Sequence, residues 1–220
     1  MIDLTHYEAV IFDMDGVLID SEPLWKIAME QTFREVGSHL TKQDFQQTVG
    51  LRLDEVITYW YAHQAWENVT PQEVEKRIVA RMVKLIQENG TPLPGVIETL
   101  AYLKKQSLKI GLATSSYSVL IDSVLSTLNI TDAFDQTHSA ENEDYGKPHP
   151  AVYLTVASQL NVSPLKCLVI EDSLNGIISG KSARMHVVCI PEKTHIVDSR
   201  LKLADFQFDD MTELLRAFKK

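Results

Sequence analysis

The 220-residue sequence predicts an α/β fold, a doubly wound parallel sheet with an all-helical domain inserted into it. Two observations indicate this class. In the second half of the chain, short β-branched runs alternate with amphipathic segments, which is the pattern of βαβ units. Between the first run and the second, over residues 20–91, the apolar positions recur at helical spacing instead.

The predicted strands consist of nearly continuous apolar residues, as expected for strands that are buried on both faces of a parallel sheet. They are Ala9–Asp13, Lys109–Thr114, Cys167–Asp172 and His186–Pro191, with a weaker one at Asp205–Phe208. Helices are predicted at Val96–Gln106, Ser118–Leu128, Pro150–Leu160 and Leu174–Ala183, and through Leu214 and Phe218 at the end of the chain.

Residues 20–91 predict a separate helical domain. Two apolar helical faces stand out, one formed by Val56, Tyr59, Trp60 and His63, the other by Val74, Ile78, Met82, Leu85 and Ile86. The second helix is expected to begin at Pro71, with Thr70 as N-cap and Glu73 as capping-box partner. The helix breakers in Asn89–Gly95 predict the return linker. The expected domains are therefore 1–19 with 92–220, and 20–91.

Composition limits the classes of function. The chain has 21 Lys and Arg against 30 Asp and Glu, a formal charge of -9. This balance disfavours nucleic-acid and membrane-surface binding, because both partners require basic surface. The sequence has no apolar run long enough to span a bilayer, and its first residues lack the pattern of a secretion signal. We therefore expect a cytoplasmic protein, with Cys167 and Cys189 as buried thiols. We also expect a monomer, a prediction that does not follow from the composition.

Polar side chains follow the carboxyl ends of three predicted strands, at Asp13, Thr114 and the pair Glu171-Asp172. Ligands of open α/β sheets bind at this edge. With Asp15 two residues after Asp13, several carboxylates meet there, and their charges repel one another in a partly buried site. Mg²⁺ prefers carboxylate, water and phosphate oxygens. The sequence therefore predicts a divalent-cation site at this edge, with Mg²⁺ as the expected ion.

Four motifs resemble those of the haloacid dehalogenase superfamily. They are the run FDMDGVLIDSE, the tripeptide LAT, the segment Gly146-Lys147-Pro148 and the run VIEDSLNG. They occur in the order found in that superfamily and cover most of the chain. The resemblance implies a Rossmann-like core with a helical cap, and a Mg²⁺-dependent phosphatase that acts on a small phosphorylated metabolite.

The resemblance also implies a role for each matching residue. Asp13 matches the nucleophile that forms an aspartyl-phosphate, and Asp15 matches the residue that protonates the leaving oxygen and then activates water. Thr114 matches the hydroxyl that binds the transferring phosphoryl group, aided by the amide of Ser115. Lys147 matches the lysine that neutralises the nucleophile and the phosphate.

Metal ligands are implied in the same way. Asp13, Asp172 and the main-chain carbonyl of Asp15 match ligands of the metal ion. Glu171 matches the acidic neighbour that holds metal-bound water.

The helical insert corresponds to a cap that closes over the active site. The run Gly50-Leu51-Arg52 resembles the substrate-specificity loop, and DSEPLW together with GLR resembles hexose- and hexitol-phosphate phosphatases. Glu22 and Arg52 are candidate substrate contacts, while Trp25 and Trp60 are interpreted as packing residues. The expected reaction is hydrolysis of small sugar or sugar-alcohol phosphates.

Other activities share this scaffold. A haloacid dehalogenase needs neither Asp15 nor Asp172. A phosphonate hydrolase uses a cap lysine, for which Lys26 and Lys42 are candidates, and usually replaces the second motif Asp by Ala. Both activities are disfavoured because Asp15 is present.

The closest alternative is a β-phosphoglucomutase. Its family has a cap His at the position of Trp25 and an Arg at the position of Leu53, so this chain departs from the pattern twice. A catalytically silent metabolite-binding protein is a further alternative. It is disfavoured because a silent protein needs no nucleophile such as Asp13.

Overall fold

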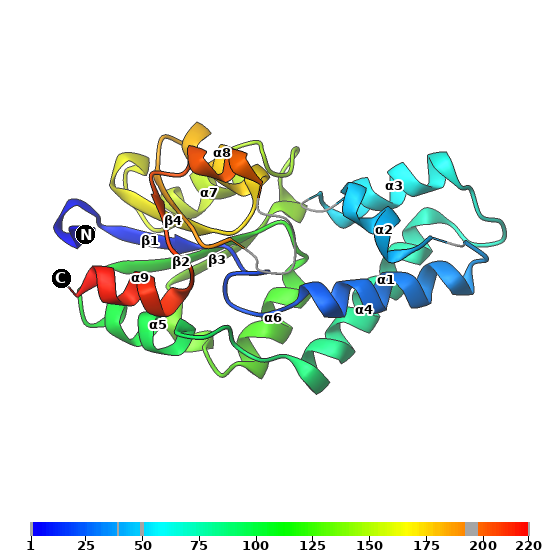
Figure 1. Ribbon diagram of the computed structural model, residues 1–220, viewed down its shortest axis with the longest axis horizontal. Helices are drawn as coiled ribbons and strands as arrows, with labels where there is room; N and C mark the ends of the chain where they lie inside the picture. The colour runs from blue at the N-terminus through cyan, green and yellow to red at the C-terminus, as the bar shows by residue number, and fades with distance from the viewer. Residues whose placement is uncertain (1, 39, 49–50, 192–197, 220) are drawn as a thin grey trace.

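The computed structural model describes residues 2–38, 40–48, 51–191 and 198–219. Over these residues it contains a six-stranded parallel sheet with the strand order β3-β2-β1-β4-β5-β6 (Figure 1). The strands are β1 (Ala9–Phe12), β2 (Lys109–Thr114), β3 (Gln136–Ser139), β4 (Cys167–Glu171), β5 (His186–Cys189) and β6 (Phe206–Gln207). Because β1 is central, its carboxyl end lies between those of β2 and β4.

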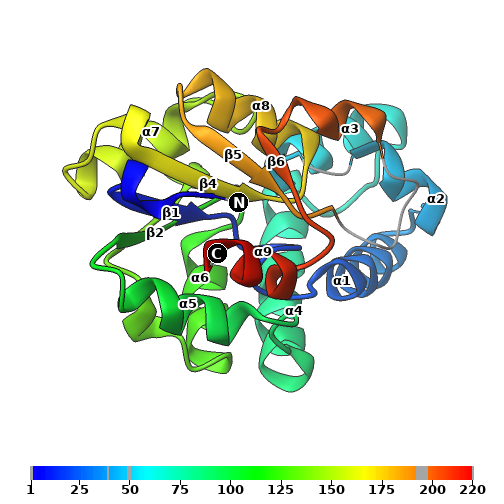
Figure 2. The ribbon, with the colours of Figure 1, turned by 60° about the vertical axis from the view of Figure 1, so that its left-hand side comes forward.

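Helices cover both faces of the sheet (Figure 2). Alternate residues of β1 explain this arrangement, since successive side chains of a strand point to opposite faces. Val10 and Phe12 belong to the apolar cluster that contains α5 (Val96–Lys104), α6 (Ser118–Thr127) and α9 (Met211–Phe218). Ala9 and Ile11 belong to the cluster that contains α7 (Ala151–Gln159) and α8 (Leu174–Ser182). The fold is therefore the predicted doubly wound α/β type.

Most of the described chain between β1 and α5 is helical. It comprises α1 (Glu22–Glu35), α2 (Lys42–Phe45), α3 (Leu53–His63) and α4 (Pro71–Asn89). Helices α1 and α3 pack on α4, and Figure 1 shows the group beyond the end of the sheet to which β1 leads. We call residues 20–91 the helical insert and the remainder the core.

The two chain segments that join the insert to the core lie side by side. Ile19 forms bridges with Asp15 and with Pro92, and the amide of Leu93 donates to the carbonyl of Leu18 at 3.0 Å. The insert therefore leaves and re-enters the core through one narrow connection. The exact domain boundaries, at residues 19 and 92, stay a prediction.

The predicted strands and most of the predicted helices are confirmed, with ends that differ by one or two residues. Strand β3 was not predicted, because Gln136–Ser139 is polar and half of it is exposed at the edge of the sheet. Short 3-10 helices are also additions to the prediction, at Leu4–His6, Gln46–Thr48, Thr131–Ala133, Ala140–Asn142, Pro164–Lys166 and Ser199–Leu203.

Two predictions from composition can be compared with the structure. Cys167 and Cys189 are both buried and unpaired, as expected of structural thiols. Across the part of the chain that the structure describes, none of the helices has the length and apolarity to cross a bilayer.

Candidate active site

Asp13 directly follows β1 and is held in an ion pair with Lys147. Its amide donates to the carbonyl of Ile170 at 2.9 Å, which fixes the backbone at the end of the strand. The Lys147 ammonium lies 2.6 Å from Oδ1 of Asp13 and 2.7 Å from Oε1 of Glu171, and it donates to the carbonyl of Ala113 at 3.1 Å. Lys147 and Asp13 are 6% and 7% exposed, so this ion pair is shielded from bulk water.

The charges around this pair do not balance. Burial raises the pKa of Asp13 to about 7, and although Lys147 lowers it, Glu171 and Asp15 raise it further. Burial lowers the pKa of Lys147, but the carboxylates of Asp13 and Glu171 raise it more, so it lies above its usual value. Lys147 is therefore a fixed cation, and the carboxylates around it carry more negative charge than it offsets.

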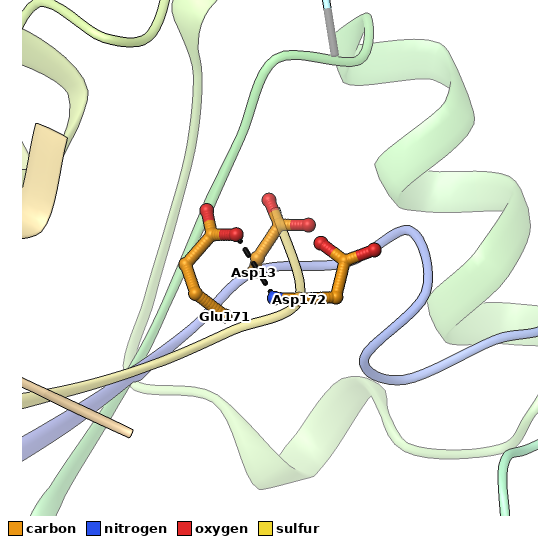
Figure 3. Close-up of side chains that lie close together, drawn as sticks. All are labelled: Asp13, Glu171 and Asp172. Atoms are coloured by element: carbon orange, nitrogen blue, oxygen red, sulfur yellow. Dashed lines mark hydrogen bonds between the residues drawn. The ribbon is translucent and has the colours of Figure 1, made fainter. Parts of the chain in front are cut away.

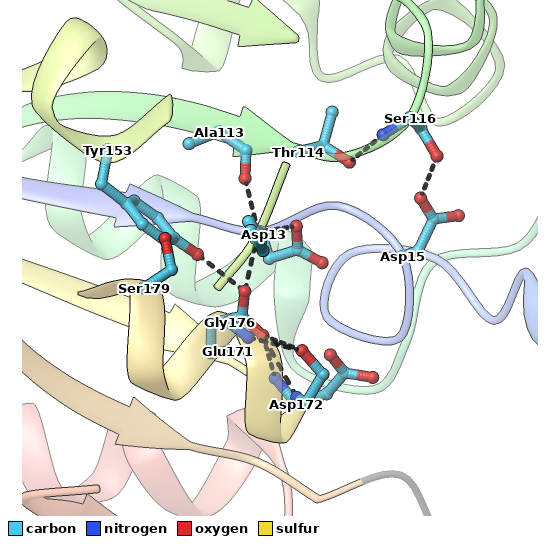
Figure 4. A network of polar contacts seen from close by, with 12 residues as sticks. Asp13, Asp15, Ala113, Thr114, Ser116, Tyr153, Glu171, Asp172, Gly176 and Ser179 are labelled. Carbon is cyan, nitrogen blue, oxygen red and sulfur yellow. Dashed lines mark hydrogen bonds and ion pairs between the residues drawn. The ribbon is translucent and has the colours of Figure 1, made fainter. Parts of the chain in front are cut away.

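Glu171, at the end of β4, has both carboxylate oxygens engaged (Figure 4). Oε1 accepts from Lys147 and, at 2.7 Å, from the hydroxyl of Tyr153. Oε2 accepts from the amide and the hydroxyl of Ser173, at 3.1 and 3.0 Å. Gly176 gives this carboxylate its room, because a Cβ there would overlap it. Glu171 thus orients Lys147 and holds the start of α8.

Asp15 lies in a different environment, made of neutral hydrogen-bond donors. Oδ1 accepts from the hydroxyl of Ser21 at 2.5 Å and from the indole Nε1 of Trp25 at 3.1 Å. Oδ2 accepts from the hydroxyl of Ser116 at 2.7 Å. Ser21 and Trp25 come from the insert side and Ser116 from the core, so Asp15 joins the two parts of the chain at the site.

The loop after β2 brings hydroxyl and amide groups to the same edge. The Thr114 hydroxyl accepts from the amide of Ser116 at 3.1 Å, and the carbonyl of Ser116 accepts from the hydroxyl of Ser139 at 2.6 Å. These contacts fix the loop from both sides. Ser115 lies between the two fixed residues and faces the same cavity as Asp13.

Asp13, Glu171 and Asp172 bring one carboxylate oxygen each to within 4.8 Å of one another (Figure 3). Gly16 has a φ of 70°, and a Cβ there would overlap the Asp172 carboxylate, so the glycine leaves the space that Asp172 occupies. This set of hard oxygen donors fits a divalent cation such as Mg²⁺. Asp13 and Asp172 are the better placed ligands, because both oxygens of Glu171 already accept hydrogen bonds.

A cavity of about 170 Å³ opens over these groups, between the core and the insert. Its floor is the polar site described above. Its outer wall comes from the insert and is lined by Glu22, Trp25, Lys26, Met29, Phe45, Thr48, Leu51, Leu53 and Val56. The volume suits a small metabolite and is below the usual range for drug-sized ligands.

A family model for haloacid dehalogenase-like hydrolases matches residues 10–190. The matched segment is most of the chain and contains each of the site residues described above. The chain belongs to the haloacid dehalogenase-like hydrolase family.

Its relatives in the haloacid dehalogenase-like family include phosphatases and a mutase. The chain is 44% identical over 207 residues to hexitol phosphatase B of Escherichia coli K12, covering 94% of this chain and 93% of that protein. It is 31% identical over 216 residues to β-phosphoglucomutase of Bacillus subtilis, covering 94% and 93%.

Among solved structures, CbbY from Rhodobacter sphaeroides in complex with phosphate matches with a TM-score of 0.85 at 23% identity. The match covers 94% of this chain and 96% of that one, and it supports the fold. With the family and the named phosphatases taken together, the chain is an enzyme of the phosphatase type.

The residues predicted from the haloacid dehalogenase motifs converge in the structure. Eight of them line the cavity or its acidic floor: Asp13, Asp15, Glu22, Thr114, Ser115, Lys147, Glu171 and Asp172. Glu22 also forms an ion pair with Lys26 at 3.0 Å. Their individual roles in the reaction stay predictions.

Arg52 is the exception among the predicted site residues. It is absent from the cavity lining formed by the described residues, and its guanidinium donates to the carbonyls of Ala140 and Glu143 in the core. Trp60 is buried inside the insert, where its Nε1 donates to the Thr48 hydroxyl at 3.4 Å. Gly50, which opens the predicted specificity loop, lies outside the described residues.

Ser21 and Tyr153 contact carboxylates of the site and carried no predicted site role, and Trp25, a candidate cap residue interpreted as packing, also contacts one of them. Ser21 and Trp25 bind Asp15, and Tyr153 binds Glu171 while its ring lies 4.8 Å from the Lys147 ammonium. Tyr153 lies in α7 within an ordinary helical pattern, so no feature of the sequence marked it out. Ser21 follows the DxD motif closely and could have been considered from its position alone.

Proposed function

We propose that this enzyme is a Mg²⁺-dependent phosphatase that hydrolyses monophosphates of small sugars and sugar alcohols through an aspartyl-phosphate on Asp13. The observation that carries the proposal is the contrast between two neighbouring carboxylates in one cavity. Asp13 is paired with a fixed ammonium, while Asp15 is held by three neutral donors.

In the first step, an oxygen of Asp13 attacks phosphorus and the bond from phosphorus to the sugar oxygen breaks. Thr114, Ser115 and Lys147 hold the phosphoryl oxygens during the transfer. Asp15 donates a proton to the departing sugar oxygen, so that the leaving group is an alcohol. Splitting a slow displacement into two covalent steps lowers each barrier.

In the second step, Asp15 is a carboxylate and accepts a proton from water. The water oxygen attacks the phosphorus of the aspartyl-phosphate, which releases inorganic phosphate and restores Asp13. General acid–base catalysis of this kind contributes roughly 10²- to 10⁴-fold in rate.

Mg²⁺, when bound, would neutralise the charge that the phosphate brings to an already acidic site. Asp13 and Asp172 would hold it, with the main-chain carbonyl of Asp15 as a further ligand. Lys147 is already committed to Asp13 and Glu171, so the protein needs this second cation to bind a dianionic substrate.

The outer wall of the cavity supports an uncharged, polyhydroxylated leaving group. Glu22 and Lys26 pair with each other there, so the described part of the wall carries polar groups but no excess positive charge for a second phosphate. The 44% identity to hexitol phosphatase B supports the same class of substrate. We therefore propose hexose 6-phosphates and hexitol phosphates as substrates.

The test is a screen of pentose, hexose and hexitol phosphates with Mg²⁺, measured as release of inorganic phosphate. We expect turnover of hexitol or hexose phosphates and its loss in Asp13→Asn, which keeps the shape of the side chain but is a poor nucleophile. A wild-type enzyme that released no phosphate from any of these substrates would refute the proposal and favour a silent binding protein.

A mutase is the second candidate, because one relative is named β-phosphoglucomutase. It is separated from the phosphatase by its product. β-Glucose 1-phosphate should yield inorganic phosphate here, and a predominance of glucose 6-phosphate would favour the mutase.

A further inference from the structure

We propose that Arg52 is a positioning residue that holds the helical insert closed over the active site by binding the core loop next to Lys147. The proposal rests on the proposed function for its kinetic part only. Its structural part concerns how the insert and the core contact each other.

Arg52 is pre-oriented by the start of α3, where it is the N-cap residue. Its amide donates to Oε2 of Glu55 at 3.0 Å, which fixes the backbone. One terminal nitrogen of its guanidinium donates to Oδ2 of Asp54 at 2.9 Å. Contacts within the insert therefore already orient the Arg52 side chain. It loses little conformational entropy when it binds the core.

The other terminal nitrogen, Nη1, crosses from the insert to the core. It donates to the carbonyls of Ala140 and Glu143, both at 3.1 Å. Hydrogen bonds from a charged donor are stronger than those between neutral groups. Because both acceptors are main-chain carbonyls, the contact depends on the position of the loop and not on the identity of its side chains.

The loop that receives Arg52 is itself fixed by the core. The side chain of Glu143 accepts from Nε2 of His138 at 2.7 Å and from the hydroxyl of Thr155 at 2.6 Å. A short stretch of chain then leads from Glu143 to Gly146 and Lys147. The carbonyl that Arg52 binds thus has a defined position relative to the catalytic ammonium.

Gly146 provides the space through which the Arg52 stem passes. A Cβ on this glycine would lie 2.7 Å from Cγ and 2.8 Å from Cδ of Arg52, closer than ordinary contacts allow. The third nearest atom is Nε of the same side chain, at 3.4 Å, so the atoms closest to that position all belong to Arg52. Any larger residue at this position would push Arg52 away from its acceptors.

Closure matters because the neighbours of Arg52 in sequence form part of the cavity wall. Leu51 and Leu53 line the cavity, while Arg52 between them points to the core. When Arg52 binds the core carbonyls, it therefore fixes the position of Leu51 and Leu53 next to the substrate. Its Nε is buried without a partner among the described residues, which opposes closure and keeps the contact reversible.

The test compares Arg52→Ala with Arg77→Ala, an exposed arginine of α4 that pairs only with Glu73 among the described contacts. We expect kcat/KM to fall by about 10- to 100-fold in Arg52→Ala, the range for one charge-assisted hydrogen bond. The fall should be similar for hexose and hexitol phosphates, and Arg77→Ala should match the wild type. A loss that varied with the sugar would instead mean direct substrate contact and would overturn the proposal.

Closure can also be measured without catalysis, by acrylamide quenching of tryptophan fluorescence in the free enzyme. Of the three tryptophans, Trp60 and Trp66 are each 5% exposed inside the insert, whereas Trp25 lines the cavity. Quenching should increase in Arg52→Ala as Trp25 becomes accessible. Unchanged quenching would refute the proposal even if the enzyme proved to act on no sugar phosphate.

Gly146→Ala perturbs the same contact from the core side. It replaces Arg52→Ala in both measurements if Arg52→Ala does not fold. It should increase quenching and lower kcat/KM as Arg52→Ala does. The double variant should then be no worse than either single variant, because both remove one contact. Additive losses would show that Gly146 acts on Lys147 directly, and they would overturn the assignment of this space to Arg52.

Discussion

Asp13 and Asp15 lie two residues apart in the chain, but their carboxylates have different electrostatic environments. Asp13 is buried with an ammonium and two further carboxylates nearby, whereas Asp15 accepts hydrogen bonds from Ser21, Trp25 and Ser116. Two carboxylates in different environments can divide the roles of nucleophile and proton carrier. The turn at Gly16 makes this division possible, because it sends the chain away from the sheet directly after Asp15.

Asp15→Asn should lower kcat by roughly 10²- to 10⁴-fold, the usual effect of losing a general acid and base. The amide has nearly the same shape, and the Ser116 hydroxyl can rotate to accept from it, so folding should be preserved. Steady-state kinetics and Mg²⁺ titration calorimetry check both parts. Wild-type turnover in this variant would remove Asp15 from its proposed role.

Asp13→Asn should stabilise the metal-free protein more at about pH 8 than at about pH 5. The pKa of Asp13 is raised from 3.8 to about 7 in the folded protein, chiefly by burial, so the folded state holds a proton that the unfolded state releases. The contribution of Asp13 to stability is therefore greatest below the unfolded pKa and is lost as the pH rises toward 7.

Thermal unfolding in EDTA measures this effect. Asparagine does not titrate, so the difference in Tm between the variant and the wild type should grow with pH. An equal difference at both pH values would contradict the raised pKa.

Most of the site could be predicted from the sequence, because its residues follow the ends of apolar strands and form recognisable motifs. What could not be predicted are contacts between residues far apart in the chain. Tyr153 reaches Glu171 from a helix, and Arg52 reaches Ala140 and Glu143 across the boundary between insert and core. The direction of such long side chains is set by packing, which spacing does not reveal.

Among the elements, α4 connects the insert to the core. It packs on α1 and α3 within the insert and on α6 of the core. Its start was predicted correctly, since the Thr70 hydroxyl accepts from the amide of Glu73 at 3.2 Å and Pro71 is the first helical residue. The Glu73 side chain pairs with Arg77, so the second half of the expected capping box is not among the described contacts.

Thr70→Ala should lower the free energy of unfolding by about 1 kcal/mol, because it removes the N-cap of α4. Urea denaturation measures the change. Thr58→Ala is the matched control, since Thr58 lies inside α3 and, among the described contacts, its hydroxyl bonds only to the carbonyl of Asp54. Equal stability of Thr70→Ala and the wild type would mean that tertiary packing alone determines where α4 begins.

Strand β3 illustrates the limit of prediction at the scale of elements. Central strands have both faces buried and appear as apolar runs, whereas β3 pairs only with β2 among the described strands and lies at the edge of the sheet. An edge strand tolerates polar residues such as those of Gln136–Ser139. Strand β3 is recognised by its pairing with β2 in the structure, because its own composition does not mark it as a strand.

At the scale of the whole molecule, an acidic protein binds an anionic substrate. The formal charge is -9, so the substrate is attracted only by the local cations of the site. Lys147, at the floor of the site, is one such cation among the described residues, and the proposed Mg²⁺ would be another. A cytoplasmic location and a monomeric state remain predictions.

Mg²⁺ should therefore raise the midpoint of thermal unfolding, since the acidic cluster exists only in the folded protein. A ligand at a hundred times its Kd contributes about 2.7 kcal/mol. Asp172→Asn should lose most of the shift, whereas Asp122→Asn, at an exposed position on α6, should keep it. The same Tm with and without Mg²⁺ would argue against a metal site here.

The central position of β1 also decides the order in which the chain can assemble during synthesis. Ala9 pairs with Lys109 on one side and with Cys167 on the other, so β1 is made long before its neighbours. The contacts among α1, α3 and α4 are closer in sequence, and these helices can pack while β1 is still unpaired. Strand β1, which leads to Asp13, is thus translated early and paired late. An interrupted chain therefore has no assembled active site.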